Sequence, residues 1–220
     1  MKVLGMGLAL GVVFWGGGGW GAEVPRALVE KFRQVRALTA DFREEKHMAI
    51  LVAPIVRAGT ISYLSPGQLA QQVTEPSPSR LVLAGNVLTM IDGQQRHVID
   101  INQQPAVGLL VRLLLGVLAG DVASLQRHAR ITFTALPAAR GVGSPRSATA
   151  QKSWSLDLDP QDPLLIKLIK KMRLSGRDAV IDELTIVDAN GDETVTRFSN
   201  VKFPAGFSAQ ERAARFGVTP

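Results

Sequence analysis

The sequence predicts an α+β fold dominated by a curved antiparallel β-sheet, and three observations lead to this prediction. Residues 59–76 alternate apolar and polar side chains on both sides of a Pro66-Gly67 turn and stop at Pro76. Short segments of the same kind, separated by turn signals, continue as far as Ile101. One long apolar segment, 105–120, then interrupts them with the length of a helix rather than a strand.

The first half of the chain begins with a predicted helix over residues 25–37. Pro25 suits a first helical turn, and apolar residues follow it at helical spacing. Leu38, Ala40 and Phe42 then alternate with polar residues, which predicts a half-exposed strand over 38–46. Glycines at the Gly85-Asn86 and Asp92-Gly93 steps accept the positive φ of tight hairpins. The remaining strands predicted in this half are 55–63, 68–75, 79–84, 87–91 and 95–101.

The segment 105–120 is apolar on nearly every side, and Arg112 is its only charged residue. A helix that is hydrophobic all round must be buried, or must cover an apolar cavity. The sequence leaves both alternatives open, a movable lid and an ordinary core helix. The segment is too short and too interrupted to span a bilayer.

The second half returns to strands, and Asn190-Gly191 supplies the turn between the last two. Short strands joined by hairpins are typical of an antiparallel meander. Residues 137–150 are rich in Pro, Ala, Gly, Ser and Arg and are predicted to form an exposed loop. No linker divides the chain, so 23–220 is predicted to be a single domain. The elements predicted here are a short helix at 122–128, a short helix or turn at 163–169, and strands at 131–136, 154–158, 171–175, 179–187 and 193–199.

Residues 1–22 have the layout of a secretory signal peptide. Lys2 is followed by an apolar stretch from Val3 to Trp15, a glycine-rich stretch and the small residue Ala22. Trp20 occupies a position where a small residue is usual, and an uncleaved membrane anchor is the alternative. The chain has no cysteine, which excludes disulfides, thiolate metal sites and a lipid-modified cysteine. An exported chain without disulfides fits a bacterial periplasm.

Composition and spacing argue against nucleic-acid binding and catalysis. The formal net charge is +6, yet the densest basic group, Lys167–Arg173, has no interleaved aromatic residues for stacking on bases. His47, His97 and His128 are far apart in the sequence, and no Gly-x-Ser-x-Gly motif is present. We therefore expect no enzyme, no metal and no cofactor.

Several segments in a fixed order together resemble the LolA-like family of periplasmic outer-membrane lipoprotein carriers. The segments are the N-terminal helix, Ala40-Asp41-Phe42 with Lys46, Gly59-Thr60-Ile61-Ser62-Tyr63, Pro66-Gly67-Gln68-Leu69, Thr74-Glu75-Pro76, Trp154–Pro160, Leu174-Ser175-Gly176 and Asn190–Thr194 leading to Phe198. The resemblance implies an incomplete antiparallel β-barrel of about 10–11 strands, with helices covering an apolar cavity. It also implies acyl chains as ligand.

The chain departs from the lipoprotein carriers near the Pro66-Gly67 turn. Ser65 stands where those carriers have an arginine that helps to latch the lid, and Leu69 and Gln71 replace aromatic residues of the following strand. The resemblance is thus to a LolA-related protein whose lipid cargo these residues leave open.

The sequence predicts a periplasmic carrier that shields acyl chains of lipoproteins or related lipids between the inner and outer membranes. By resemblance, its donor is an inner-membrane exporter and its acceptor lies at the outer membrane. We expect a monomer that does not bind nucleic acid. The alternative is a protein-binding envelope sensor or assembly module on the same fold. The predicted ligand-binding residues are Ile61, Tyr63, Leu69, Val73, Leu81, Leu83, Leu88, Met90, Ile99, Ile101, Leu110 and Leu114.

Overall fold

The computed structural model describes residues 23–136 and 153–217, so the predicted signal peptide and the whole of the predicted loop 137–150 lie outside the described residues. The helices are α1 (Arg26–Arg33), α2 (Pro105–Leu118), α3 (Val122–Gln126), α4 (Pro163–Ile166) and α5 (Ala209–Phe216). The strands are β1 (Ala37–His47), β2 (Ile55–Leu64), β3 (Gln68–Glu75), β4 (Ser79–Ala84), β5 (Val87–Asp92), β6 (Gln95–Asp100), β7 (Ala129–Leu136), β8 (Ser153–Pro160), β9 (Ile169–Arg177), β10 (Val180–Asp188) and β11 (Glu193–Lys202).

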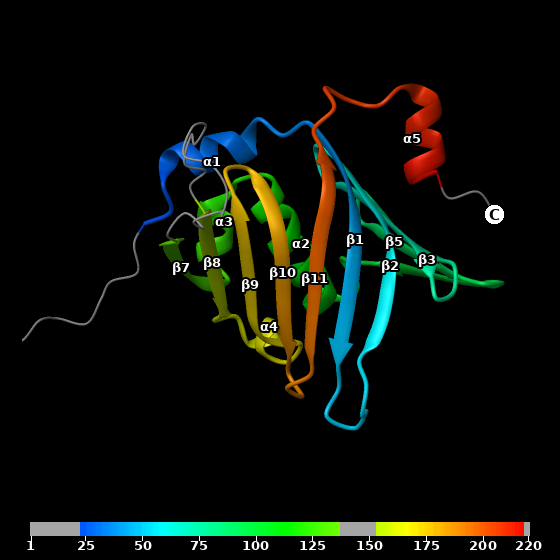
Figure 1. The fold of residues 1–220 in the computed structure, drawn as a ribbon, viewed down its shortest axis with the longest axis horizontal. Helices are drawn as coiled ribbons and strands as arrows, with labels where there is room; N and C mark the ends of the chain where they lie inside the picture. The colour runs from blue at the N-terminus through cyan, green and yellow to red at the C-terminus, as the bar shows by residue number, and fades with distance from the viewer. Residues whose placement is uncertain (1–22, 137–152, 218–220) are drawn as a thin grey trace, which may run out of the picture.

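All eleven strands form one antiparallel sheet in the order β6-β5-β4-β3-β2-β1-β11-β10-β9-β8-β7. The first strand, β1, pairs with the last, β11, at the centre of the sheet. The edge strands β6 and β7 are not paired with each other, so the barrel stays open, as the sequence predicted. The chain passes from β6 to β7 through α2 and α3, which lie behind the strands in the view of Figure 1.

Tight turns set the register of the hairpins. Gly93 and Gly191 have φ values of 56° and 98°, a backbone region that favours glycine. The hairpins around them pair Asp92 with Gln95 and Val187 with Glu193. Gly93 and Gly191 therefore occupy the hairpin turns that the sequence predicted.

Two hydrophobic clusters lie on the concave side of the sheet, one toward each edge. The larger cluster joins β7–β10 to the helices and contains fully buried residues such as Leu158, Leu165 and Met172. The smaller contains Leu83, Leu88 and Ile101 on the β3–β6 side. Helix α2 packs against both, which explains why its sequence is apolar all round.

The contact between α2 and the end of β6 is very close. A Cβ atom on Gly108 would lie 2.5 Å from the carbonyl oxygen of Ile101, so only glycine fits there. The exposed side of α2 carries Arg112, whose guanidinium donates a hydrogen bond to Asn102 at 3.2 Å. The single charge of the segment therefore lies at an exposed position.

Helix α5 on the convex side was not predicted. Its start has a capping box, in which the Ser208 hydroxyl accepts from the Glu211 amide and the Glu211 carboxylate accepts from the Ser208 amide. The helix brings Phe216 onto Ala70 and Val82, which point away from the concave face. This packing buries Val82 to 1% exposure, and without it that face would lie open to water.

The predicted helix at residues 25–37 was too long. It ends at Arg33, and Ala37 already belongs to β1. Ala37 is fully buried in the strand, and apolar spacing alone did not separate it from the helix.

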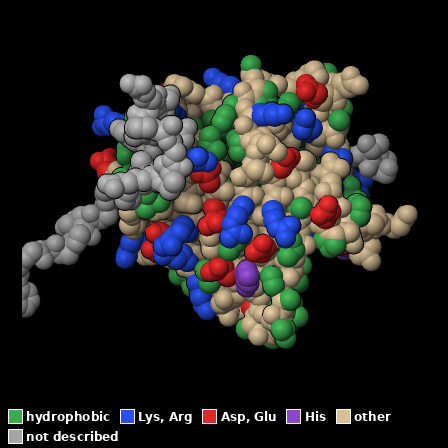
Figure 2. Space-filling view, in the orientation of Figure 1, with side chains coloured by type: hydrophobic (Ala, Val, Ile, Leu, Met, Phe, Trp, Pro, Cys, Tyr) green, Lys and Arg blue, Asp and Glu red, His purple; other side chains and the backbone are tan. Residues whose placement is uncertain are grey.

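Within residues 23–136 and 153–217, the helices all fall short of the length and apolar character needed to cross a bilayer. Charged side chains of both signs are interspersed on the side of the molecule that Figure 2 shows.

Core packing predicts that the same substitution at two leucines lowers the stability of the protein by very different amounts. Leu158→Ala should lower the free energy of unfolding by about 2–5 kcal/mol, because the side chain has 0% exposure and leaves a cavity. Leu51→Ala, the same substitution at a 44% exposed position, should change it by less than about 1 kcal/mol. Urea unfolding followed by circular dichroism measures both, and equal losses would contradict the assignment of the core.

Candidate functional site

A cavity of about 350 Å³ lies between the concave face of the sheet and α2. Side chains of β1–β5 and β9–β11 form one wall, and six residues of α2 form the other. Carboxylate, amide and hydroxyl groups are few among them, and the remainder of the lining is apolar. The α2 residues are Val107, Leu110, Val111, Leu114, Val117 and Leu118.

Strand register explains why these side chains converge. Residues directly opposite one another in an antiparallel pair point to the same face. Phe42 of β1 pairs with Phe198 of β11, and Ala40 pairs with Ile61 of β2, so all four face the cavity. Along β1 the alternation continues from Leu38 to Glu44.

The structure places eight of the twelve predicted ligand-binding residues in the cavity wall, and their contact with a ligand stays a prediction. Those eight are Ile61, Tyr63, Leu69, Leu81, Leu83, Leu88, Leu110 and Leu114. Ile101 and Ile99 belong instead to the cluster that packs around Leu83 and Leu88. Val73 is buried opposite Ser79, and Met90 lies opposite Leu81, both outside the lining.

Sequence reasoning missed the contribution of the central strands. Phe42, Phe198 and Leu184 line the cavity, as do Ile181 and Ile186. The alternation of Leu38, Ala40 and Phe42 was visible in the sequence. What was not visible was the pairing of β1 with β11, which turns that alternating face toward the same space as β10.

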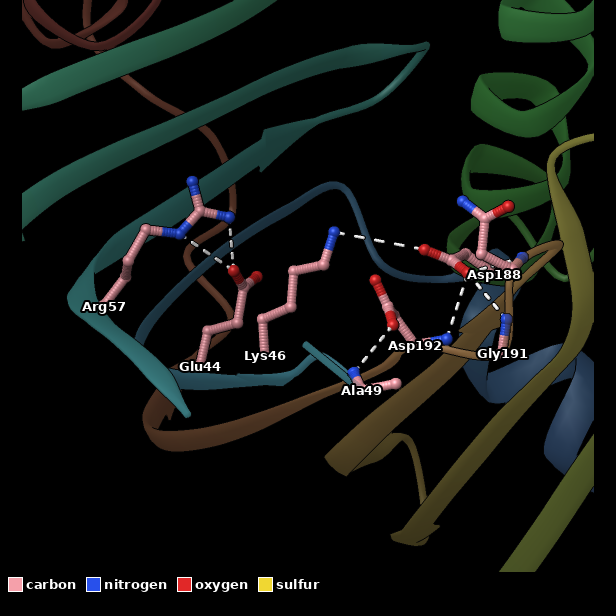
Figure 3. A network of polar contacts seen from close by, with 8 residues as sticks. Glu44, Lys46, Ala49, Arg57, Asp188, Gly191 and Asp192 are labelled. Carbon is pink, nitrogen blue, oxygen red and sulfur yellow. Dashed lines mark hydrogen bonds and ion pairs between the residues drawn. The ribbon is translucent and has the colours of Figure 1, made fainter. Parts of the chain in front are cut away.

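One end of the cavity is polar, and Figure 3 shows the Glu44 carboxylate of this end with its partner Arg57. The Glu44 carboxylate, only 10% exposed, accepts hydrogen bonds from the Arg57 guanidinium, with Nε at 2.9 Å from Oε1. Its other oxygen accepts from the Thr196 hydroxyl at 3.3 Å. In the part of the chain that the structure describes, every buried side-chain polar atom has a hydrogen-bond partner. The Glu44 carboxylate is therefore satisfied within the protein, and most of the remaining cavity wall is apolar.

Tyr63 is the only tyrosine of the chain and lies in the cavity wall with 2% exposure. Burial raises the pKa of its phenol above the ordinary value of 10.0, and a hydrogen bond with Ser65 acts in the opposite direction. The raised pKa means that the wall disfavours charge at this position.

The described residues contain no group of three or more His, Asp or Glu side chains that could hold a metal ion. His128 contacts the Asp162 carboxylate at 3.3 Å, away from the cavity lining. The geometry thus defines a mostly apolar cavity, formed by an open antiparallel barrel and a helix across its concave face.

Comparison with solved structures gives several matches, and three of them are as follows. One is a LolA superfamily protein from Nitrosomonas europaea, 12% identical, with a TM-score of 0.43, covering 87% of this chain and 97% of that one. Another is the MucA/MucB complex of Pseudomonas aeruginosa, 11% identical, with a TM-score of 0.48, covering 84% of this chain and 57% of that one. A third is the lipoprotein LppX of Mycobacterium tuberculosis, 8% identical, with a TM-score of 0.40, covering 83% and 98%.

The family named by the sequence resemblance is thus represented among the structural matches. No protein-family model matches the chain, and no curated protein matches it.

The environment of Tyr63 leads to a prediction that absorbance can check directly. Because it is the only tyrosine, the ultraviolet titration of the protein reports its phenol alone. We expect the midpoint of this titration to lie above 10.0 in the folded protein and at about 10 in urea. The neutral phenol's stabilising contribution should be complete below the unfolded pKa and lost as the pH rises through the folded pKa. Identical midpoints, with far-ultraviolet circular dichroism intact, would show that the wall is open to water.

Proposed function

We propose that the protein is a carrier that holds acyl chains of a lipid or lipoprotein in its cavity while they pass from the inner to the outer membrane. The observation that carries the proposal is the cavity of about 350 Å³, walled by apolar side chains of the sheet and α2. This volume lies within the roughly 300–1,000 Å³ that is usual for small-molecule sites. The predicted export of the chain supports a place for the carrier in the periplasm.

The energetics favour a hydrocarbon guest. Burying each methylene group stabilises a complex by about 0.8 kcal/mol, before the cost of ordering the ligand. The polar groups at the Glu44 end already have partners, so the binding energy comes from the apolar wall. Release then requires a second conformation or an acceptor that binds the chain better.

Helix α2 is the element whose position controls the size of the cavity. It contributes six residues to the lining and lies between the two hydrophobic clusters. A guest with more than one acyl chain would need α2 to move away from the sheet. In this proposal α2 is the lid, and the closed position is the one described.

Purification from the periplasm followed by native mass spectrometry and lipid extraction tests the function directly. We expect a co-purified lipid, and saturable uptake of a fluorescent fatty acid by the delipidated protein. Absence of both would reject the carrier. If a captured protein partner remained bound when the cavity was filled, a sensor or assembly module would be the better description.

A cavity-filling variant should separate binding from folding. Leu184 of β10 lines the cavity, and Leu184→Trp should occupy its space and weaken fatty-acid uptake at least tenfold. Thr185→Trp is the matched control, because Thr185 lies opposite Arg173 on the other face of the same strand. Fluorescence titration measures both variants, and equal affinities would place the ligand elsewhere.

Acidic substitutions test whether α2 is a lid. Leu110→Asp or Leu114→Asp should reduce ligand retention more than tenfold, because a carboxylate facing an apolar cavity is costly to desolvate. Arg112→Asp, on the exposed side of the helix, should keep retention near that of the wild type.

Thermal unfolding monitored by circular dichroism accompanies the retention assay. If both cavity-facing variants unfold while Arg112→Asp does not, α2 is structural core and the lid assignment is wrong.

A further inference from the structure

The loop between β1 and β2, Met48–Pro54, exposes large apolar side chains at one end of the molecule. Ile50 is 84% exposed and Val52 is fully exposed, with Leu51 at 44% between them. None of the seven loop residues is charged. Figure 1 places the loop at the lower tip of the view, and hydrophobic side chains gather at that tip in Figure 2. These side chains do not contribute to the packed interior, because they belong to none of the hydrophobic clusters.

The base of the loop is held by polar contacts, which Figure 3 shows. The backbone amide of Ala49 donates to the Asp192 carboxylate at 3.2 Å. The neighbouring Asp188 carboxylate accepts from three amides of the β10–β11 turn and contacts Lys46 Nζ at 4.0 Å. The loop is therefore fixed to this turn while its apolar tip points away from the protein.

The loop lies at the polar end of the cavity. Glu44, the last cavity-lining residue of β1, comes four positions before Met48. Helix α4 lies at the same end of the sheet in Figure 1 and adds the exposed Ile166. Lys167 and Lys170, which follow it, are exposed as well. Two acidic groups of this end, Asp188 and Asp192, accept hydrogen bonds from backbone amides, whereas Glu193 beside them is exposed.

We propose that the loop Met48–Pro54 inserts into the interfacial layer of a lipid bilayer with anionic headgroups. This rests on the proposed carrier function and deepens it, because insertion would bring one end of the cavity to the membrane from which an acyl chain is taken. Apolar side chains enter the boundary between headgroups and acyl chains, while the exposed Lys167 and Lys170 remain at the level of the phosphates.

The size of the apolar tip favours a bilayer over a protein partner. A stable protein–protein interface uses roughly 20–30 residues from each side, including a buried core. A seven-residue loop that projects from the surface offers much less. A bilayer accepts an isolated projecting tip, because lipids close around it without a complementary surface.

Flotation with vesicles of phosphatidylcholine containing a quarter phosphatidylglycerol tests the proposal on the delipidated protein. We expect the wild type to float with the vesicles, and Ile50→Asp or Val52→Asp to bind at least tenfold more weakly. Val98→Asp is the matched control, because Val98 is 58% exposed on the edge strand β6 and should leave binding unchanged. If all variants float like the wild type, or the wild type does not float, membrane insertion is wrong.

A second measurement separates this inference from the carrier function. Uptake of a fluorescent fatty acid from solution should be the same in Ile50→Asp and in the wild type, whereas its extraction from vesicles should be slower in the variant. Loss of uptake by the wild type would reject the carrier and leave the flotation result standing. Light scattering completes the test, because a wild-type dimer that Ile50→Asp converts to a monomer would assign the loop to self-association and overturn the proposal.

Discussion

The burial of α2 is the constraint on which the rest of the structure depends. Its 14 residues carry one charge, so almost every side of the helix must be covered by other apolar groups. The sheet supplies that cover by curving around the helix, with β6 and β7 left as unpaired edges. The connection from β6 through α2 to β7 crosses the concave side, so the strand pairing that would close the barrel does not form.

The position of the cavity follows from the positions of the two clusters that α2 contacts. The two clusters on the concave side draw on β3–β6 and on β7–β10, and neither contains a side chain of β1 or β11. The helix is thus supported on both sides and bridges the central strands. There Phe42 and Phe198 face the helix without joining either cluster, and the cavity occupies the space between. The cavity wall therefore combines residues of both clusters with residues of β1 and β11 that belong to neither.

Local patterns were enough to predict the strands and much of the candidate site. Hairpins with short turns transmit register over a few residues, so Ile61, Tyr63 and Leu69 could be placed on one face from their spacing. The pairing of β1 with β11 joins segments at opposite ends of the domain, and no local pattern contains it. For that reason the contribution of Phe198 to the cavity was not predicted.

Helix α5 was missed for a different reason. Its signal, Ser208 followed by Glu211, was present in the sequence, but Phe216 is the only large apolar residue of the segment. Its function in the fold depends on a surface that only the assembled sheet presents, the convex side with Ala70 and Val82. A short helix of this kind is specified by its cap and its docking site together.

The apolar loop between β1 and β2 differs from the apolar helix α2 because the protein itself does not cover its side chains. The apolar side chains of α2 and Phe216 of α5 pack against the protein itself, and their exposure would destabilise the fold. The loop is fixed by Asp192 with its tip outward, so it contributes no burial to folding. Exposed apolar side chains on a segment held in place are costly to solubility unless something else covers them. In the proposed carrier this links the loop to the cavity beside it: the cavity would hold an apolar guest away from water, and the loop would present an apolar surface where such a guest is found.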